Sequence, residues 1–151
     1  MFLKILVPLD GSPVAEMALD YAKDLAFKDA ATIHLVRASS PELLVGALGG
    51  HPVPQALIDA QRQLHHDYLV SKQAELGAYL VQLHRPLGEA GAAILEVAER
   101  EGCDLIVMTS HGRTGLSRFV MGSVAERVAR HAPCPVFIVG QESLRAKGEV
   151  L

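Results

Sequence analysis

The sequence has few cysteines, no long apolar run and no recognisable leader, and each shortage excludes a class of protein. Its two cysteines, Cys103 and Cys134, do not form a CxxC pair, so we interpret them as reduced thiols of a reducing compartment. The longest uncharged stretch, Leu43–Ile58, is interrupted by glycine, proline and histidine, which excludes a membrane span. The first residues, Met1–Ile5, show neither a basic leader followed by a long apolar stretch nor a cleavage site, so we expect a cytoplasmic protein.

Several motifs of nucleotide, acyl and metal chemistry are also missing. The sequence contains no GxxxxGK[ST] motif, which excludes a P-loop hydrolase, and no GxGxxG, the dinucleotide-binding fingerprint. It also contains no GxSxG nucleophile elbow. The only suggestion of a metal site is the run His65–Asp67, but adjacent histidines on a helix point in different directions and a pair at i, i+4 is absent. We interpret this run as a solvated helix face.

The composition is that of one ordinary domain, which we expect to span residues 1–151: half of the side chains are apolar and 21% are charged. The net charge of −3 is unevenly distributed, because Leu105–Gln141 holds four arginines and a single acid and therefore sums to +3. A broad nucleic-acid surface would need more basic side chains. A local cationic segment in an acidic chain instead favours a small anionic ligand.

The beginning of the chain has the pattern of a βαβ unit. Leu3–Leu9 is a short, almost wholly apolar run, as expected of a strand covered on both faces. The turn Asp10–Pro13 follows, in which Ser12 is suited to cap a helix and Pro13 to begin it. Apolar residues then recur at helical spacing up to a second apolar strand, Thr32–Ala38.

The remainder alternates helices and strands after a long Gly- and Pro-containing segment. We expect 39–54 to be a flexible loop and 142–151 a frayed tail. The elements predicted between them are a helix over Gln55–Gly77, a short strand over Leu80–Arg85, a helix over Gly91–Glu101 closed by Gly102, a strand over Leu105–Met108, a helix over Ser123–His131 and a strand over Val136–Val139. This order predicts a Rossmann-like α/β fold: an open, mainly parallel five-stranded sheet with helices on both faces.

Ligands of such sheets bind beyond the carboxyl ends of the strands, which directs attention to three segments. Two of them, Asp10–Ser12 and Arg37–Ser40, are short. The third, Thr109–Met121, is far longer than the roughly 2 to 6 residues usual for such connections, and it contains glycines, hydroxyls and two arginines. Followed by a helix N-terminus, it has the parts of a phosphate cradle. Gly122-Ser123 also fits a helix cap, because Ser123–Glu126 reads as a capping box, and the two roles are compatible.

Separate blocks of the sequence together resemble the universal stress protein family, and the resemblance extends from Leu3 to Val139. The blocks that carry it are Ile5–Ser12, Asp104–Met108, Ser110–Arg118, Gly122–Val128 and Pro133–Val136. ATP-binding members of that family share the loop motif G-x2-G-x9-G-[S/T]. Gly112 and Gly122-Ser123 match its second half, whereas Thr109 stands in place of the first glycine. Threonine is costly there if the position needs a positive φ, and costs little if only its amide is used.

The resemblance implies a doubly wound fold of the adenine nucleotide alpha hydrolase type and an adenine nucleotide, ATP or else ADP or AMP, with Mg²⁺ as its companion ion. Asp10 would meet the ribose hydroxyls or the adenine edge, although an Asx turn that opens the first helix is the alternative role. The other residues that the resemblance places around the nucleotide are Pro8 and Leu9 beside Asp10, Ala38 at the adenine, Met108 and Thr109 at the base or sugar, and Gly112, Arg113, Gly122, Ser123 and Val124 along the phosphates. We expect His111 either to shape the loop or to contact a phosphate.

The function expected from this reading is a nucleotide-binding stress-response regulator, not a fast catalyst. No general base stands at an obvious spacing, so any ATP hydrolysis should be slow. A nucleotide-free, dimeric interaction module of the same family is the alternative, which Thr109 leaves open. An ATP-dependent transferase is a third candidate function. The family resemblance also implies a homodimer in which Val136–Val139 pairs across a twofold axis.

Overall fold

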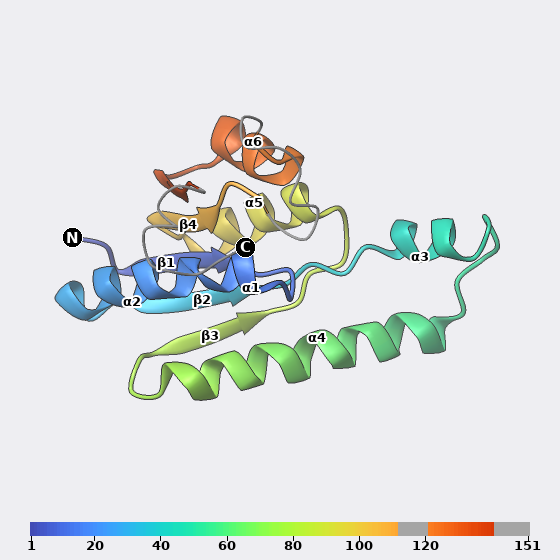
Figure 1. Cartoon of the computed structure of the whole chain (residues 1–151), viewed down its shortest axis with the longest axis horizontal. Helices are drawn as coiled ribbons and strands as arrows, with labels where there is room; N and C mark the ends of the chain where they lie inside the picture. Colours follow the sequence, from blue (N-terminus) through green and yellow to red (C-terminus); the bar gives the residue numbers. More distant parts are fainter. Residues whose placement is uncertain (112–120, 141–151) are drawn as a thin grey trace.

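The computed structural model, which describes residues 1–111 and 121–140, contains one sheet of five strands in the order β3-β2-β1-β4-β5 (Figure 1). All four strand pairings are parallel, and the expected α/β fold is confirmed. The strands are β1 Lys4–Pro8, β2 Thr32–Val36, β3 Val81–His84, β4 Leu105–Thr109 and β5 Val136–Val139. The helices are α1 Pro13–Glu16, α2 Ala18–Asp29, α3 Pro41–Ala47, α4 Gln55–Leu76, α5 Ala90–Glu101 and α6 Ser123–His131.

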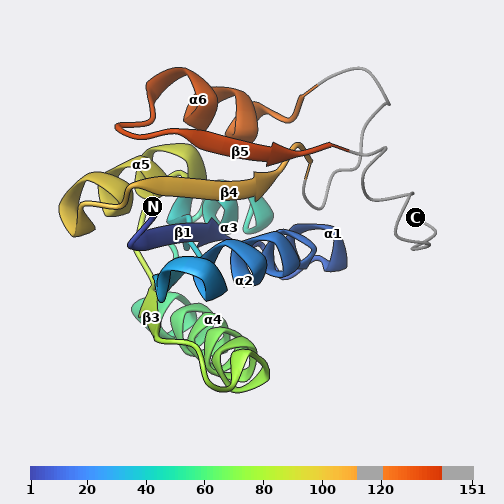
Figure 2. The same ribbon diagram turned by 90° about the vertical axis from the view of Figure 1, so that its left-hand side faces the viewer.

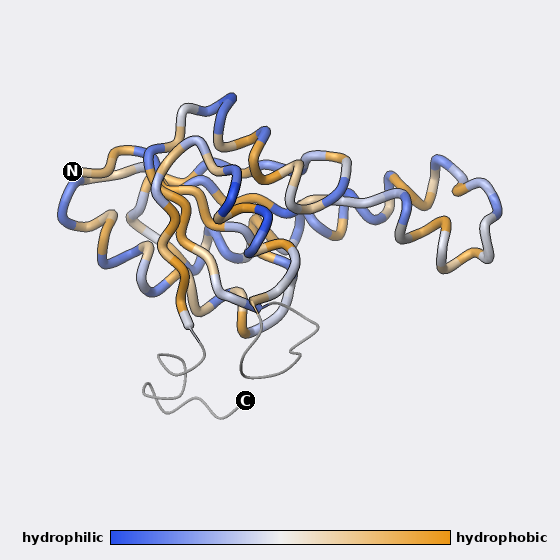
Figure 3. The backbone as a smooth tube through the Cα atoms, turned by 90° about the horizontal axis from the view of Figure 1, so that it is seen from above, coloured by the Kyte–Doolittle hydropathy of each residue, from blue (hydrophilic) through white to orange (hydrophobic). Residues whose placement is uncertain are grey.

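Two apolar cores hold the helices against opposite faces of the sheet. Successive side chains of a strand point to opposite faces, so Ile5 and Val7 of β1 join a core with α1, α2 and α4. Leu6, between them, joins the second core, with α5 and α6. All three side chains are fully buried, which explains why the central strand is apolar without alternation. Figure 2 shows the helices on either side of the strands, and in Figure 3 the hydrophobic colour is concentrated along the central strands.

The segment 39–54, which we expected to be a loop throughout, contains the short helix α3. Pro41 occupies its first turn, where a missing N–H costs nothing, although the Gly, Pro and Ser content of the segment is typical of a loop. α3 and the first turns of α4 extend away from the sheet (Figure 1), and among the side chains described in α3 none belongs to the buried core. Without that burial, the sequence lacks the periodic apolar stripe from which a helix is normally predicted.

The helix expected after Pro13 is divided in two. Ser12 caps α1 as predicted, its Oγ accepting a hydrogen bond from the amide of Ala15 at 3.2 Å. Met17 then separates α1 from α2, a break that the continuous apolar spacing did not indicate. Within the described part of the chain, no helix is long and apolar enough to cross a bilayer.

Candidate functional site

The carboxyl ends of β1 and β4 lie side by side, and the strand that follows each in sequence lies on the outer side of it, β2 beside β1 and β5 beside β4. β1 is central, pairing with β2 along one edge and with β4 along the other. Strand order therefore reverses between β1 and β4, which is where doubly wound sheets open a ligand crevice. The end of β2 is on the same edge, where the amide of Leu9 donates to the carbonyl of Val36 at 2.9 Å. Pro8, Leu9 and Ala38, all expected near a nucleotide, thus come together around this edge.

Asp10 forms the Asx turn that was one of its two expected roles. Its Oδ1 accepts hydrogen bonds from the amide of Ser12 at 2.9 Å and from the Oγ of Ser12 at 2.5 Å. Gly11 between them has a φ of +87°, a conformation that glycine adopts without steric cost. The carboxyl group is only half-buried. Both of these bonds are made by the single oxygen Oδ1.

Arg37 follows β2 and places a positive charge at the same edge of the sheet. It was not among the site residues predicted from the sequence. A Cβ placed on Gly11 would lie 2.9 Å from Nη2 of Arg37, so the guanidinium rests directly against this turn. Its Cζ lies 4.6 Å from the centroid of the Tyr68 ring on α4, a cation–π contact. The segment Arg37–Ser40 was singled out in the sequence, but a partner on a distant helix leaves no local signal.

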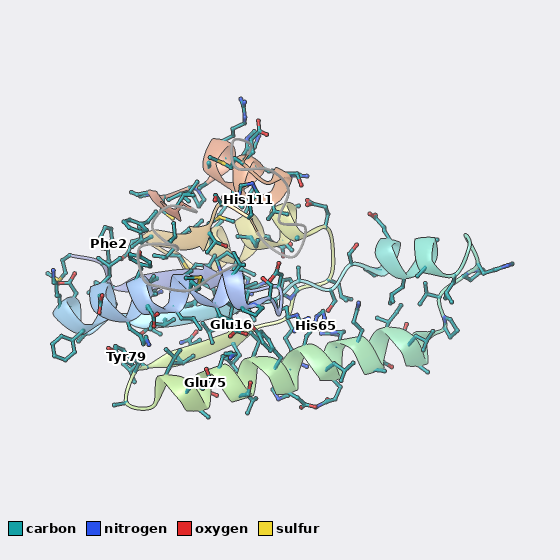
Figure 4. All side chains as sticks on the ribbon, viewed as in Figure 1. Phe2, Glu16, His65, Glu75, Tyr79 and His111 are labelled. Carbon is teal, nitrogen blue, oxygen red and sulfur yellow. The ribbon has the colours of Figure 1, made fainter. Side chains whose placement is uncertain are left out.

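Tyr68 is part of a polar bridge from α4 to α1. Its hydroxyl donates to Oε1 of Glu16 at 2.8 Å, and Nζ of Lys72 lies 2.9 Å from Oε2 of the same carboxylate. Burial, followed by the bond to Glu16, raises the pKa of Tyr68, so the phenol stays protonated. Glu16 is labelled in Figure 4, where it lies between these helices. The bridge fixes the helix against which Arg37 is stacked.

Thr109 adopts an ordinary strand conformation. Among the described residues, the only non-glycine residue with a positive φ is Ala30. Thr109 is buried at the end of β4, and its Oγ1 donates to the carbonyl of His111 at 2.6 Å. The threonine therefore causes no backbone strain, and its hydroxyl shapes the turn that leaves the strand. Met108, just before it, is packed in the core with α5 and α6.

We expect Thr109→Gly to lower the free energy of unfolding by about 1 to 2 kcal/mol, because it removes this hydrogen bond and puts glycine into a strand. Thr109→Ser keeps the hydroxyl and should lose less. Urea unfolding of both variants measures the difference. A Thr109→Gly protein as stable as the parent would show that the bond to His111 has no structural weight.

The end of β4 and the start of α6 are joined by backbone. The amide of Gly122 donates to the carbonyl of Ser110 at 2.8 Å, and a Cβ on Gly122 would lie 3.0 Å from the same oxygen. The His111 ring is buried beside them: its Nδ1 lies 3.0 Å from Oγ of Ser110, and its Nε2 has no hydrogen-bond partner among the described residues. Gly112 and Arg113 lie outside the described residues.

The predicted capping box at the start of α6 is wrong. Gly122, not Ser123, is the N-cap, and no side-chain cap hydrogen bond is present. The helix begins one residue earlier than a capping box on Ser123 requires, and the close contact with Ser110 favours glycine at the cap. The amides of Ser123 and Val124 are in the first turn, where a helix leaves its N–H groups without intrahelical acceptors. This end of α6 offers donors to an anion.

The sequence predicts that His65 lies on a solvated helix face, but in the structure its side chain is buried. Its Nδ1 lies 2.7 Å from the Oγ of Ser39, which is fully buried after β2. Figure 4 shows His65 on α4 beside the chain that follows β2. The available signal was its place four residues before the buried Leu69, on the same side of the helix. The bond fastens α4 next to the edge that carries Ala38.

Comparisons with known proteins agree on one family. The sequence profile of the universal stress protein family matches residues 1–140. Universal stress protein MJ0531 of Methanocaldococcus jannaschii is 34% identical over 143 residues, an alignment that covers 92% of this chain and 82% of that protein.

Solved structures share the fold. Universal stress protein UspA from Lactobacillus plantarum superposes with a TM-score of 0.77 at 23% identity, over 91% of this chain and 97% of the other. A universal stress protein solved in complex with cAMP superposes with a TM-score of 0.63 at 24% identity, over 92% of this chain and 97% of the other. The profile match over nearly the whole sequence, together with the relative above 30% identity, shows that the chain belongs to the universal stress protein family.

Proposed function

We propose that this protein binds an adenine nucleotide, ATP in the first place, at the edge formed by Asp10 and the segment from Thr109 to Ser123. The observation that carries the proposal is the backbone link between Gly122 and Ser110, because it sets the N-terminus of α6 at the end of β4, beside the turn of Asp10. Amide donors for phosphates and an acceptor for ribose hydroxyls would then lie on the same edge of the sheet. The nucleotide acts as a regulatory ligand of a cytoplasmic stress-response protein.

Each part of the nucleotide has a chemically matched region. The phosphates would lie against the amides of Ser123 and Val124 at the start of α6, a helix of nine residues with an oriented dipole. Asp10 would accept from the ribose hydroxyls beside the turn that its Oδ1 forms. The base would lie near Pro8, Leu9 and the half-buried Ala38. Gly112 and Arg113 complete the proposed phosphate contacts.

Mg²⁺ would accompany ATP as a counter-ion of its phosphates. The described donors at the phosphate end are amides, hydroxyls and a ring nitrogen, which suit the anion better than the hard cation. Asp10, the carboxylate placed at this edge, is on the ribose side and already accepts two hydrogen bonds. A cradle of amides holds phosphate without positioning a water for attack, so hydrolysis should be slow.

A nucleotide-free dimeric interaction module is the second candidate, favoured by the edge strand β5. The sheet ends at β5, and the side chain of Phe137 is 42% exposed on it. An open apolar edge strand is a template for pairing with another chain. We propose a homodimer through Val136–Val139 in either case, with the nucleotide deciding between the two functions.

Denaturing the purified protein should release adenine nucleotide, detectable by mass spectrometry of the supernatant.

For the apo protein, we expect Asp10→Asn to weaken ATP binding about tenfold in calorimetric titration, since the amide keeps an oxygen for the turn but removes a charged acceptor for the ribose. cAMP is titrated in parallel, because it shares adenine and ribose but has one cyclised phosphate.

Asp24→Asn is the matched control, being the same substitution on the exposed surface of α2. Its affinity for ATP should equal that of the parent. A clean supernatant together with flat titrations would refute the nucleotide proposal and leave the interaction module. If only the affinity of Asp10→Asn is unchanged while the parent binds ATP, Asp10 has the structural role of forming its turn and does not contact the nucleotide.

A further inference from the structure

A buried histidine and a half-buried histidine from neighbouring strands meet on the face of the sheet opposite α4. His34 of β2 is 1% exposed, and its Nδ1 lies 3.0 Å from Nε2 of His84, the last residue of the edge strand β3. Ile33 and Leu35 face the core with α2 and α4, so His34 points to the other side. We propose that His34 and His84 share one hydrogen-bonded proton that fastens β3 to the sheet at neutral pH, and that acid breaks this fastening.

The ring geometry is that of an end-to-end hydrogen bond. The two ring planes differ by 6° and the centroids are 5.2 Å apart, much farther than the 3.0 Å between the nitrogens. Each nitrogen therefore points at the other along the line between the rings, which is the arrangement of an N–H donating to a ring lone pair. Face-to-face stacked rings would not bring two nitrogens together in this way.

The surroundings determine which ring donates. Nδ1 of His84 lies 3.8 Å from Oε1 of Glu101, so a proton on that nitrogen faces a carboxylate. Nε2 of His84 is then the acceptor, and Nδ1–H of His34 donates to it. Nε2 of His34, buried without a partner among the described residues, is left as a bare lone pair. The reverse arrangement would bury an N–H there without an acceptor, which is rarer in proteins.

An added proton has no favourable place in this arrangement. Taken up at Nε2 of His34, it creates an N–H that has no acceptor. If the shared proton then passes to Nε2 of His84, the charge moves beside Glu101, but the unpaired N–H on His34 remains. Taken up directly at His84, the proton sets two N–H groups against each other and separates the rings. Every route breaks the bond or leaves a buried donor unpaired.

The charges around the pair do not compensate for an imidazolium. Lys4 of β1 and Arg100 of α5 act against a further cation, whereas Glu101 and Asp104 favour it. Both carboxylates are already engaged: Glu101 accepts from Nε of Arg100 at 2.9 Å, and Asp104 accepts from the amides of Leu3 and Lys4.

Burial is the largest influence on both rings and lowers the pKa of His34 and of His84 below the ordinary value of 6.5. Cys103 close by stays a neutral thiol, because burial raises its pKa to about 12. The unfolded chain therefore takes up protons first as the pH falls below 6.5. The stability that the pair contributes is fully present above that value and is lost as the pH falls below it, towards the lowered pKa of the folded state.

A metal ion fits the cluster less well than a proton does. The ligand atoms of His34, His84 and Glu101 lie within 4.8 Å of one another, as a metal site would require. Zinc needs two nitrogen lone pairs directed at a common point about 2.0 Å from each. Here the nitrogens are directed at each other, and the nearby Lys4 and Arg100 oppose a divalent cation.

Fastening β3 affects the functional edge as well as the strand. His84 stands directly opposite Val36 in the sheet, and its carbonyl accepts from the amide of Arg37 at 3.1 Å. Arg37 and Ala38 follow immediately. Release of β3 in acid should therefore loosen the end of β2, independently of whether a nucleotide binds there.

The test uses the full-length protein without ligand. Nitrogen-resolved NMR of the imidazoles should show a protonated Nδ1 on both rings at about pH 7.5, with both rings titrating below the ordinary histidine value. Amide hydrogen exchange in β3, corrected for the intrinsic effect of pH, should become about tenfold faster or more at about pH 5.5. His84→Gln should remove this acceleration, whereas the exposed His131→Gln on α6 should keep it.

Three outcomes would overturn the proposal. The first is titration of both rings at the ordinary value. The second is an unchanged pH dependence of β3 exchange in His84→Gln. The third is stoichiometric binding of Zn²⁺ at neutral pH that His84→Gln abolishes, which would make the cluster a metal site. Because NMR is performed on the wild-type chain, the proposal stays testable even if the variant does not fold.

Discussion

Leu69→Ala should lower the free energy of unfolding by about 2 to 5 kcal/mol, the cost of deleting a fully buried leucine. Leu69 is 0% exposed and packs in the core that α4 shares with β2. Because the first turns of α4 project beyond the sheet (Figure 1), a small set of anchors, among them Leu76 and the bond of His65 to Ser39, holds this long helix in place. Replacing Leu69 by alanine leaves a cavity and removes the central anchor of this helix.

The chain offers a matched control five residues away. Leu64→Ala is the same change in the same helix, so any effect of helix propensity is equal, but Leu64 is 68% exposed. Its free energy of unfolding should change by less than about 0.5 kcal/mol. Urea unfolding of the two variants gives the comparison directly. Equal losses would contradict the placement of α4.

Gly122→Val should weaken ATP binding about a hundredfold, equivalent to losing two amide bonds to phosphate at about 1.5 kcal/mol each. The backbone at Gly122, with φ −61° and ψ 151°, is open to other residues, so conformation alone does not demand glycine. The demand is steric: a Cβ would lie 3.0 Å from the carbonyl oxygen of Ser110. Valine must push the start of α6 away from β4, and the donor amides move with it.

Gly140→Val is the control, because a Cβ at Gly140 meets no atom of the described residues within 4 Å. We expect it to bind ATP like the parent in the same calorimetric titration. Circular dichroism should show that Gly122→Val keeps its helices. If that variant binds ATP normally, the nucleotide does not use the amides of α6.

The fold could be predicted from the sequence because its signals are local. Short apolar runs marked the strands, and β3, the weakest of them, was found at Val81–His84 within the predicted Leu80–Arg85. Helices with an apolar stripe, such as α5, were found because their burial imposes the pattern. α3 was missed for the opposite reason, since a projecting helix has no stripe to display.

The candidate site was predictable only in outline. The carboxyl ends of the strands and a glycine-rich connection identified the edge, but the contacts that organise it are made between distant segments. Arg37 meets Tyr68 on α4, and His34 meets His84 across 50 residues of sequence. Such pairs depend on strand order and register, which a single sequence does not specify. Thr109 shows the converse: an apparent defect in a motif proves to be an ordinary strand residue with its own bond.

The strand order also governs how the chain assembles during synthesis. β1 can pair with β2 as soon as Thr32–Val36 has emerged from the ribosome, but its other edge stays open until Leu105–Thr109 is made. In that interval an apolar strand edge is exposed, the condition under which nascent chains aggregate. A chain that stops before β4 therefore lacks one of the two strands whose ends form the candidate site, and it presents an unpaired apolar strand edge to its neighbours.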